Sequence, residues 1–396
     1  MIQRQEYLNK LLSFKDKQLI KIVTGVRRCG KSTLFELYQA QLLKSGVNKN
    51  QIQSINLEDP AYSELLDWKK LYDYINKRLI SNKQNYIFID EIQNVADFEK
   101  AADGLFIKKN VDLYLTGSNS KMQSGEWATL LSGRYIEIHM LPLSFKEYHS
   151  ASFTGNIEET FSNYLENSSF PYALQLDGDR KQIRDYLGGI YNTIVLKDVV
   201  ENKKIRDVSR LESVIKFVSD NIGNLTSIKK ISDTMTSDGI KMLPLTIENY
   251  LDAFRESYIL YKASRYDVKG KKLLQTLDKY YLVDIGLRYY LLGDKKADRG
   301  HILENIVYLE LLRRGYKVYI GKVADKEIDF VAEGIDGIEY YQVADTVADT
   351  KTLERELTPL NAIKDHNPKI ILTRDFDPKT SHNGIKQINI FDWLLQ

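Results

Sequence analysis

The 396-residue sequence predicts an α/β protein that begins with a three-layer domain, in which helices cover both faces of a parallel sheet. Two observations lead to this prediction. Across residues 1–150, short apolar runs alternate with amphipathic segments of helical periodicity. The short runs are rich in Ile, Val, Leu and Tyr, as parallel strands buried on both faces are. The expected strands are 19–26, 52–57, 86–89, 111–115 and 135–140, and the expected helices are 32–43, 63–79 and 96–105.

Composition excludes several classes of protein. The single cysteine cannot form an internal disulfide or a thiolate metal cluster, so we expect a reducing, cytoplasmic location. The 56 basic and 54 acidic side chains give a net charge of +2, which fits neither a polybasic coat protein nor an acidic solvating chain. No apolar run approaches the roughly 18 residues of a membrane span, and the amino terminus has no secretory apolar region. We therefore expect no membrane association.

The strongest motif directly follows the first expected strand. Residues 25–32 read G-V-R-R-C-G-K-S and match the phosphate-binding pattern G-x-x-x-x-G-K-[ST]. Such a loop wraps its N–H groups around phosphate oxygens, while Lys31 would reach the β- and γ-phosphates and Ser32 would offer its hydroxyl to Mg²⁺. A fortuitous glycine turn is the alternative, which the preceding strand and the following helix disfavour. The predicted nucleotide-binding residues are Gly25, Val26, Arg27, Arg28, Cys29, Gly30, Lys31, Ser32 and Thr33. Cys29 could make nucleotide binding sensitive to oxidation, although an inert loop cysteine is favoured.

Two acidic residues end the third expected strand. The apolar run Y-I-F-I is followed by Asp90 and Glu91, which places both carboxylates at the carboxyl edge of the sheet, where open α/β sheets bind ligands. Asp90 is expected to hold the water shell of Mg²⁺, and Glu91 is expected to polarise the attacking water as a general base. A strand that merely ends in a solvated acidic turn is the alternative, and it is disfavoured beside a phosphate-binding loop.

Two further positions are catalytic candidates with open alternatives. The fourth expected strand ends in T-G-S-N-S, where Asn119, or else Ser118, could contact the γ-phosphate or orient the water. A turn that caps the strand is the alternative. Arg134 could be an arginine finger, in cis or from a neighbouring subunit. It could equally be a surface arginine paired with Glu126 or Glu137.

The order of these motifs resembles a group of prokaryotic AAA+-like P-loop ATPases of the archaeal type. The resemblance covers the whole chain and is carried by G-V-R-R-C-G-K-S, I-F-I-D-E-I-Q, L-T-G-S-N-S, L-S-G-R-Y and P-L-S-F-K-E-Y. It implies an additional strand between the strand before the P-loop and the strand that ends in Asp90, which makes Glu91 the catalytic glutamate. It also implies that the carboxyl-terminal region combines a winged helix with a restriction-nuclease-like fold.

Beyond the ATPase core at 1–150, we expect a helical extension or lid at 151–204, a winged helix-turn-helix at 205–292 and a second α/β unit at 293–396. Residues 201–292 carry 16 basic and 12 acidic side chains, whereas 293–396 carry 15 and 18. The basic excess gathers on a hairpin predicted from strands 259–266 and 273–277. Its cations could contact DNA phosphates, or the hairpin could be a solvated turn. The candidate DNA contacts are Lys262, Arg265, Lys269, Lys271 and Lys272.

The last unit resembles the PD-(D/E)XK fold. Nucleases of this type hold Mg²⁺ with a Glu on a helix, an Asp on a strand and a Glu or Gln two residues before a Lys. Glu304, Asp329 and Gln342 occupy these positions in the expected order, but Ala344 replaces the lysine. We therefore expect a degenerate site, with nuclease activity as the less favoured alternative.

These observations lead to one preferred function and two alternatives. The preferred function is an ATPase that binds MgATP and hydrolyses it to ADP, and whose nucleotide state drives the carboxyl-terminal half, with DNA as the candidate partner. A nucleotide-dependent switch or binding module with negligible turnover is the first alternative, and an ATP-gated DNA nuclease is the second. A homo-oligomer stays open, since Arg134 could act on a neighbouring subunit.

Overall fold

The computed structural model describes residues 2–118, 131, 133–176, 178–201, 203, 205–274, 277–293, 299–376 and 381–396, without the side chains of 196, 197 and 201. The chain forms two compact units. Unit 1 comprises Met1–Pro142 with Glu256–Tyr258, and unit 2 comprises Leu143–Arg255 with Ile259–Gln396. In the described part of the chain, no helix is long and apolar enough to cross a membrane.

Unit 1 contains a fully parallel sheet of five strands in the order β2-β3-β4-β1-β5. Each strand predicted from the sequence is present. The strand β4 lies between β1 and β3, which confirms the additional strand that the family resemblance implied. The strands are β1 Ile20–Thr24, β2 Ile52–Asn56, β3 Asn85–Asp90, β4 Val111–Gly117 and β5 Tyr135–His139.

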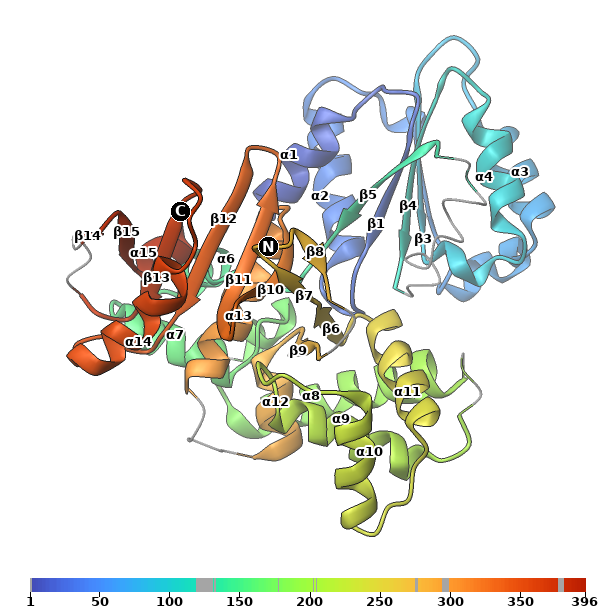
Figure 1. Ribbon diagram of the computed structural model, residues 1–396. Coiled ribbons are helices and arrows are strands. Elements are labelled where there is room, and N and C mark those ends of the chain that lie inside the picture. The colour runs from blue at the N-terminus through green and yellow to red at the C-terminus, as the bar shows by residue number, and fades with distance from the viewer. Residues whose placement is uncertain are drawn as a thin grey trace. The chain divides into compact units, whose positions relative to one another are not determined.

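Helices cover both faces of this sheet, α1 and α2 on one face and α3 and α4 on the other (Figure 1). Successive side chains of the central strands point to opposite faces of the sheet. Phe88 and Tyr114 stack on each other and meet Phe35 of α2, whereas Ile87 and Leu113 belong to the core that includes α3 and α4. The helices are α1 Gln5–Ser13, α2 Lys31–Lys44, α3 Trp68–Asn76 and α4 Phe98–Phe106.

The helix expected over 63–79 is divided in the structure. A 3₁₀ helix, Pro60–Leu66, precedes α3, and Asp67 separates the two. The Asp67 carboxylate accepts hydrogen bonds of 3.0 Å from the backbone N–H groups of Lys69 and Lys70. An aspartate that caps a helix in this way takes an extended backbone conformation, which ends the preceding turn.

A buried polar network crosses the amino-terminal edge of the same sheet. Lys21 of β1 and Asp112 of β4 form an ion pair of 2.5 Å, and both side chains are fully buried. Asp112 also accepts hydrogen bonds from the Tyr114 hydroxyl and from the backbone N–H of Asp16, each 2.8 Å long. Burial lowers the pKa of Lys21 and raises that of Asp112, despite their mutual attraction. Nothing in the sequence pattern identified this network in advance.

Residues 256–258 are distant in sequence from the rest of unit 1. Tyr258 is fully buried, adopts a left-handed backbone conformation with φ of 59° and packs its ring 4.8 Å from that of His139 on β5. Unit 1 is therefore completed by a segment that lies more than 100 residues beyond its last strand.

Unit 2 begins with the helices that the sequence predicts from about residue 145. Asp284 stabilises this region by capping α12 and accepting hydrogen bonds from the backbone N–H (2.7 Å) and hydroxyl (2.6 Å) of Ser169. The helices are α6 Phe145–Ser152, α7 Ile157–Glu166, the 3₁₀ helix Pro171–Leu176, α8 Arg180–Asn192, the π-helix Thr193–Glu201, α9 Val208–Asp220, α10 Ile228–Ser237, α11 Pro244–Glu256 and α12 Ile285–Leu292.

The hairpin predicted from strands 259–266 and 273–277 is only partly confirmed, because two short strands, β8 (Lys272–Leu273) and β9 (Lys279–Leu282), replace its second strand. Its first strand is interrupted near Ser264, so that β6 (Leu260–Ala263) pairs with β9 (Lys279–Leu282) alone. The outer part, β7 (Arg265–Asp267), pairs with β8 (Lys272–Leu273) and also joins the carboxyl-terminal sheet beside β10. The sequence predicted one hairpin and did not reveal that its outer half extends another sheet.

The carboxyl-terminal sheet has eight strands in the order β14-β15-β13-β12-β11-β10-β7-β8. Along the chain, α13 is followed by the three antiparallel strands β10, β11 and β12. The helix α14 comes next and leads to β13, which is parallel to β12. The elements are α13 Arg299–Arg313, β10 Lys317–Val323, β11 Lys326–Gly334, β12 Gly337–Val343, α14 Thr350–Asn361, β13 Lys369–Thr373, β14 Ser381–His382, β15 Ile385–Asn389 and α15 Ile390–Leu395.

The Lys21–Asp112 pair yields a prediction about stability. Asp112→Ala leaves the Lys21 ammonium buried without its carboxylate, which costs about 3–5 kcal/mol when a buried pair loses one partner. We expect a lower urea midpoint of unit 1, followed by the near-ultraviolet signal of its aromatic residues. Lys100→Ala removes the exposed partner of Asp97 from within α4 and serves as the control, with an unchanged midpoint expected. Equal midpoints of the two variants would contradict the prediction.

Candidate nucleotide site

The loop between β1 and α2 is fixed by two glycines. Gly25 has φ of 145°, and a Cβ atom at this position would lie 2.1 Å from the carbonyl oxygen of Met140, which directly follows β5. Gly30 has φ of 103° and caps the amino terminus of α2. Both backbone conformations favour glycine. The loop therefore curls in front of a helix amino terminus, whose free N–H groups and dipole favour anions.

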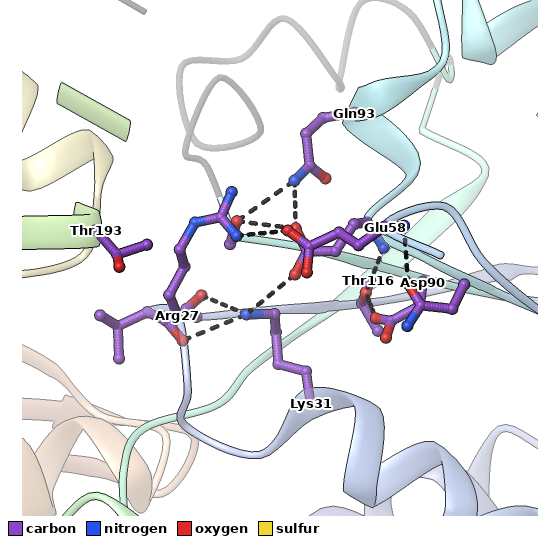
Figure 2. A network of polar contacts seen from close by, with 12 residues as sticks. Arg27, Lys31, Glu58, Asp90, Gln93, Thr116 and Thr193 are labelled. Atoms are coloured by element: carbon purple, nitrogen blue, oxygen red, sulfur yellow. Dashed lines mark hydrogen bonds and ion pairs between the residues drawn. The ribbon is translucent and has the colours of Figure 1, made fainter. Parts of the chain in front are cut away.

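The P-loop lysine lies between the loop and an acidic strand end (Figure 2). Lys31 Nζ donates hydrogen bonds to the carbonyl oxygens of Gly25 (3.0 Å) and Val26 (3.3 Å). The same ammonium is 3.9 Å from Oε1 of Glu91. The side chain is buried, so its charge acts on its surroundings with little screening by water.

Asp90, the last residue of β3, meets two hydroxyl groups. It accepts a hydrogen bond from Thr116 at the end of β4 and another from Ser32 at the start of α2. Burial raises the pKa of Asp90, and these hydrogen bonds oppose the rise. A carboxylate beside an exposed serine hydroxyl is the donor set that Mg²⁺ takes in P-loop proteins, so these residues fit the metal.

Glu91 is held in place through its backbone N–H and through one oxygen of its carboxylate. Its backbone is left-handed, with φ of 55°, and its N–H donates to the Thr116 hydroxyl (2.9 Å). Its Oε2 accepts hydrogen bonds from the amide of Gln93 and from the Ser118 hydroxyl (2.9 Å) (Figure 2). Burial would raise the pKa of Glu91, but the charges of Lys31 and Arg27 outweigh it, so that the pKa is lowered. Glu91 is therefore ionised at neutral pH.

Three residues that contact this site were not among the sequence predictions. Gln93 and Thr116 bind the two carboxylates directly. The third residue, Glu58 beyond β2, forms a 2.8 Å ion pair with Arg27 of the loop. Thr116 sits where a buried strand turns polar, which is the signal that identified Asp90, so it could have been found. Gln93 and Glu58 lie in short connections whose folding no periodicity describes.

The structure places the remaining loop residues as follows. Val26 and Cys29 are fully buried, whereas Arg28 is exposed with a left-handed backbone and Thr33 is half-buried. Burial raises the pKa of the Cys29 thiol, so its reactive thiolate form is disfavoured. This supports an inert loop cysteine.

Of the further catalytic candidates, one lies outside the described residues and another, Arg134, lies away from the P-loop. Asn119 lies outside the described residues, whereas Ser118 contacts Glu91 as described above. Arg134 precedes β5, and its carbonyl accepts the N–H of Ile20 at the amino-terminal edge of the sheet. Because β1 and β5 are parallel, Arg134 lies about five residues, roughly 16 Å, from the P-loop edge. Its guanidinium faces Asp103 of α4 at 3.5 Å. Arg134 therefore does not act as an arginine finger on the P-loop of the same chain, and it forms a surface ion pair with Asp103 instead. Glu137, which the sequence offered as a partner, accepts a hydrogen bond from the hydroxyl of Thr24.

A second polar group lies in unit 2, where the three nuclease-motif residues converge. Glu304 of α13 is buried and accepts hydrogen bonds from Lys279 (2.8 Å) and from the Tyr281 hydroxyl (2.5 Å) of β9. Lys279 is also 2.8 Å from Glu327 of β11. Asp329, two residues further along β11, accepts the N–H of Val343 at 2.8 Å and is joined to Gln342 through its own N–H (3.4 Å). We call Glu304, Glu327 and Asp329 the C-terminal carboxylate cluster.

The charges of this cluster are strongly coupled. Burial and then the charge of Glu304 raise the pKa of Asp329 well above its ordinary range. Burial would lower the pKa of Lys279, but Glu304, Asp329 and Glu327 outweigh it and raise the pKa. Lys279 is therefore a permanent cation. The sequence did not predict it at this site, because it comes from the hairpin rather than from the nuclease-like unit.

The basic hairpin exposes fewer cations than its sequence suggested. Lys269, Lys271 and Lys272 are exposed at the turn. Lys262 pairs with Asp278 at 3.2 Å, and Arg265 is half-buried in β7.

Comparison with known proteins agrees with this geometry. Residues 17–149 match the family described as AAA domain, and residues 158–298 match a domain of unknown function, DUF8612. Fold and site thus define an AAA-type ATPase domain.

The family membership rests on two relatives. An uncharacterized protein of Haemophilus influenzae is 40% identical over 100% of this chain and 99% of its own length. The uncharacterized protein MJ1544 of Methanocaldococcus jannaschii is 30% identical over 94% of this chain and 85% of its own length. The chain belongs to the family of these two proteins. The Walker-type ATPase PABY2304 of Pyrococcus abyssi, at 14% identity and a TM-score of 0.50, covers 74% of this chain and 96% of its own and shares the fold.

Proposed function

We propose that the protein binds MgATP at the P-loop and hydrolyses it to ADP and phosphate. The observation that carries this proposal is the position of Glu91. Its ionised carboxylate is oriented by Gln93 and Ser118 and lies 3.9 Å from the ammonium of Lys31. A general base and a phosphate-binding cation are thereby held at one edge of the sheet.

The residues have distinct roles in this proposal. The loop N–H groups and the amino terminus of α2 bind phosphate oxygens, and Lys31 moves its ammonium from the loop carbonyls to the β- and γ-phosphates. Ser32 and Asp90 would hold Mg²⁺, which neutralises phosphate charge when bound. Glu91 accepts the proton of the attacking water. The ammonium of Lys31 stabilises the negative charge that develops on the γ-phosphate oxygens in the transition state.

The first prediction separates binding from hydrolysis. Glu91→Gln keeps the hydrogen-bonding shape but removes the base, so we expect turnover to fall by about 10²–10⁴-fold with ATP binding retained. Lys31→Ala is expected to lose both, because the phosphates lose their cation. Phosphate release and binding of a fluorescent ATP analogue measure the two effects. Lys44→Ala, an exposed lysine at the far end of α2, is the control. If Glu91→Gln turns ATP over as fast as the wild type, Glu91 is not the base. Negligible turnover by the wild type itself favours the alternative of a switch without catalytic turnover.

Gln93 provides a second prediction, as a positioning residue. Gln93→Ala releases one side of the Glu91 carboxylate, and we expect kcat to fall by about 10-fold, or 1.4 kcal/mol, with KM unchanged. Steady-state kinetics distinguish this from lost nucleotide affinity, which would raise KM. Asn94→Ala removes an exposed neighbour in the same 3₁₀ turn and is expected to behave as wild type.

For unit 2 we propose a winged-helix arrangement that contacts DNA through its hairpin. The order α9, α10, α11, β6 and β9, with an antiparallel bridge between Thr226 and Asp278, supports this assignment. The helix that would enter a major groove is acidic, since α11 carries Glu248, Asp252 and Glu256, and its Arg255 already pairs with Asp252. Phosphate contact is therefore assigned to the three exposed lysines of the hairpin turn.

The hairpin assignment predicts a specific salt dependence. Replacing Lys269, Lys271 and Lys272 by Ala should weaken duplex DNA binding and lower the slope of log K against log salt concentration by about 2–3. Fluorescence anisotropy at several salt concentrations measures this slope. The matched control replaces the exposed lysines Lys229, Lys230 and Lys241. An equal loss in the control, or no loss in either, would count against the hairpin as the DNA contact.

A further inference from the structure

The nuclease-like topology of the carboxyl-terminal sheet raises the question of a divalent metal ion. Among the residues that the structure describes, no three carboxylate, imidazole or thiol groups lie close enough together to share one. The third motif position is also engaged elsewhere, because the Gln342 amide donates to Glu356 at 2.8 Å and accepts from the N–H of Asp329. Ala344 supplies no charge. The donor set therefore does not fit a catalytic Mg²⁺ site.

A different cation occupies the cluster. Lys279 and Tyr281 are two residues apart on β9, so both side chains point to the same face and meet Glu304. The ammonium of Lys279 lies 2.8 Å from Glu304 and 2.8 Å from Glu327, and its side chain is 4% exposed. Two of its three N–H donors are thus directed at carboxylates from two separate elements, α13 and β11.

We propose that Lys279 is the resident cation of the C-terminal carboxylate cluster, and that it takes the place of a divalent metal ion. The ammonium of Lys279 pairs with two of the three carboxylates, Glu304 and Glu327, and the sheet needs no metal to be stable. Because Lys279 belongs to β9, the same contact fastens the hairpin to α13 and β11. The carboxyl-terminal sheet is then a structural body that moves with the hairpin, rather than a nuclease.

This proposal is independent of ATP hydrolysis, since all of its residues belong to unit 2. It has two consequences. The stability of unit 2 depends strongly on the ammonium of Lys279, and divalent cations do not change that stability. Two experiments on the full-length chain test them.

The first experiment measures thermal stability. Lys279→Met leaves the buried Glu304 and the partly exposed Glu327 without their cation, and we expect the unfolding midpoint of unit 2 to fall by on the order of 10 °C. Lys262→Met, which removes a half-exposed lysine on the neighbouring strand, is the matched control and should shift the midpoint by at most about 2 °C. Adding Glu304→Gln to Lys279→Met removes the orphaned charge and is expected to recover part of the loss. A midpoint of Lys279→Met equal to that of the control, or no recovery in the double variant, overturns the proposal.

The second experiment measures metal binding directly. MnCl₂ is titrated calorimetrically into the nucleotide-free Lys31→Ala protein, in which the P-loop site is disabled. We expect no stoichiometric Mn²⁺ binding that depends on Asp329, and the same unfolding midpoint in Mn²⁺ and in EDTA. One-to-one Mn²⁺ binding that disappears in Asp329→Asn would show that the cluster takes a metal, and the proposal would be wrong.

Discussion

The hydroxyl of Thr116 connects the parts of the nucleotide site. It donates to Asp90 and accepts the backbone N–H of Glu91, so one side chain on β4 fixes the last residue of β3 and the acidic residue that follows it. This is possible only because β4 lies between β3 and β1, with Thr116 opposite Val23 in the β1 register. The P-loop begins at Gly25, two residues after Val23. The distance between the loop and the carboxylates of Asp90 and Glu91 is thus set by the ladder of a buried sheet, which is among the least deformable parts of a protein.

Much of this arrangement could be predicted from the sequence, because buried parallel strands leave a clear apolar record. All five strands of unit 1, the P-loop and the two acidic residues were identified in this way. The position of β4 came from the family resemblance, since strand order is not a local property. Arg134 was misplaced because its turn precedes a strand, whereas ligands gather where strands end. Gln93 and Lys279 escaped detection for a related reason: one lies in an irregular turn, and the other reaches its partners across 25 residues of sequence.

The bent hairpin explains how unit 2 can be one compact body although its sequence contains several patterns. Its inner strands pair with each other, its outer strands extend the carboxyl-terminal sheet, and Lys279 adds an ionic contact between the same parts. The basic segment 201–292 and the acidic segment 293–396 are adjacent in sequence, and Lys279 of the first pairs with Glu304 and Glu327 of the second. The three lysines at the hairpin turn remain exposed to solvent.

Unit 1 is built from two stretches of the chain that are distant in sequence, and this has a consequence for its biosynthesis. Its sheet ends at β5, but Tyr258, which covers His139, is translated more than 100 residues later. A nascent chain can therefore form the sheet while the helices of unit 2 are still being made, yet it exposes the ring of His139 until residue 258 has left the ribosome. The core of unit 1 is complete only after most of the helical region has been synthesised. A chain that ended between residues 142 and 256 would therefore lack this last contact of unit 1.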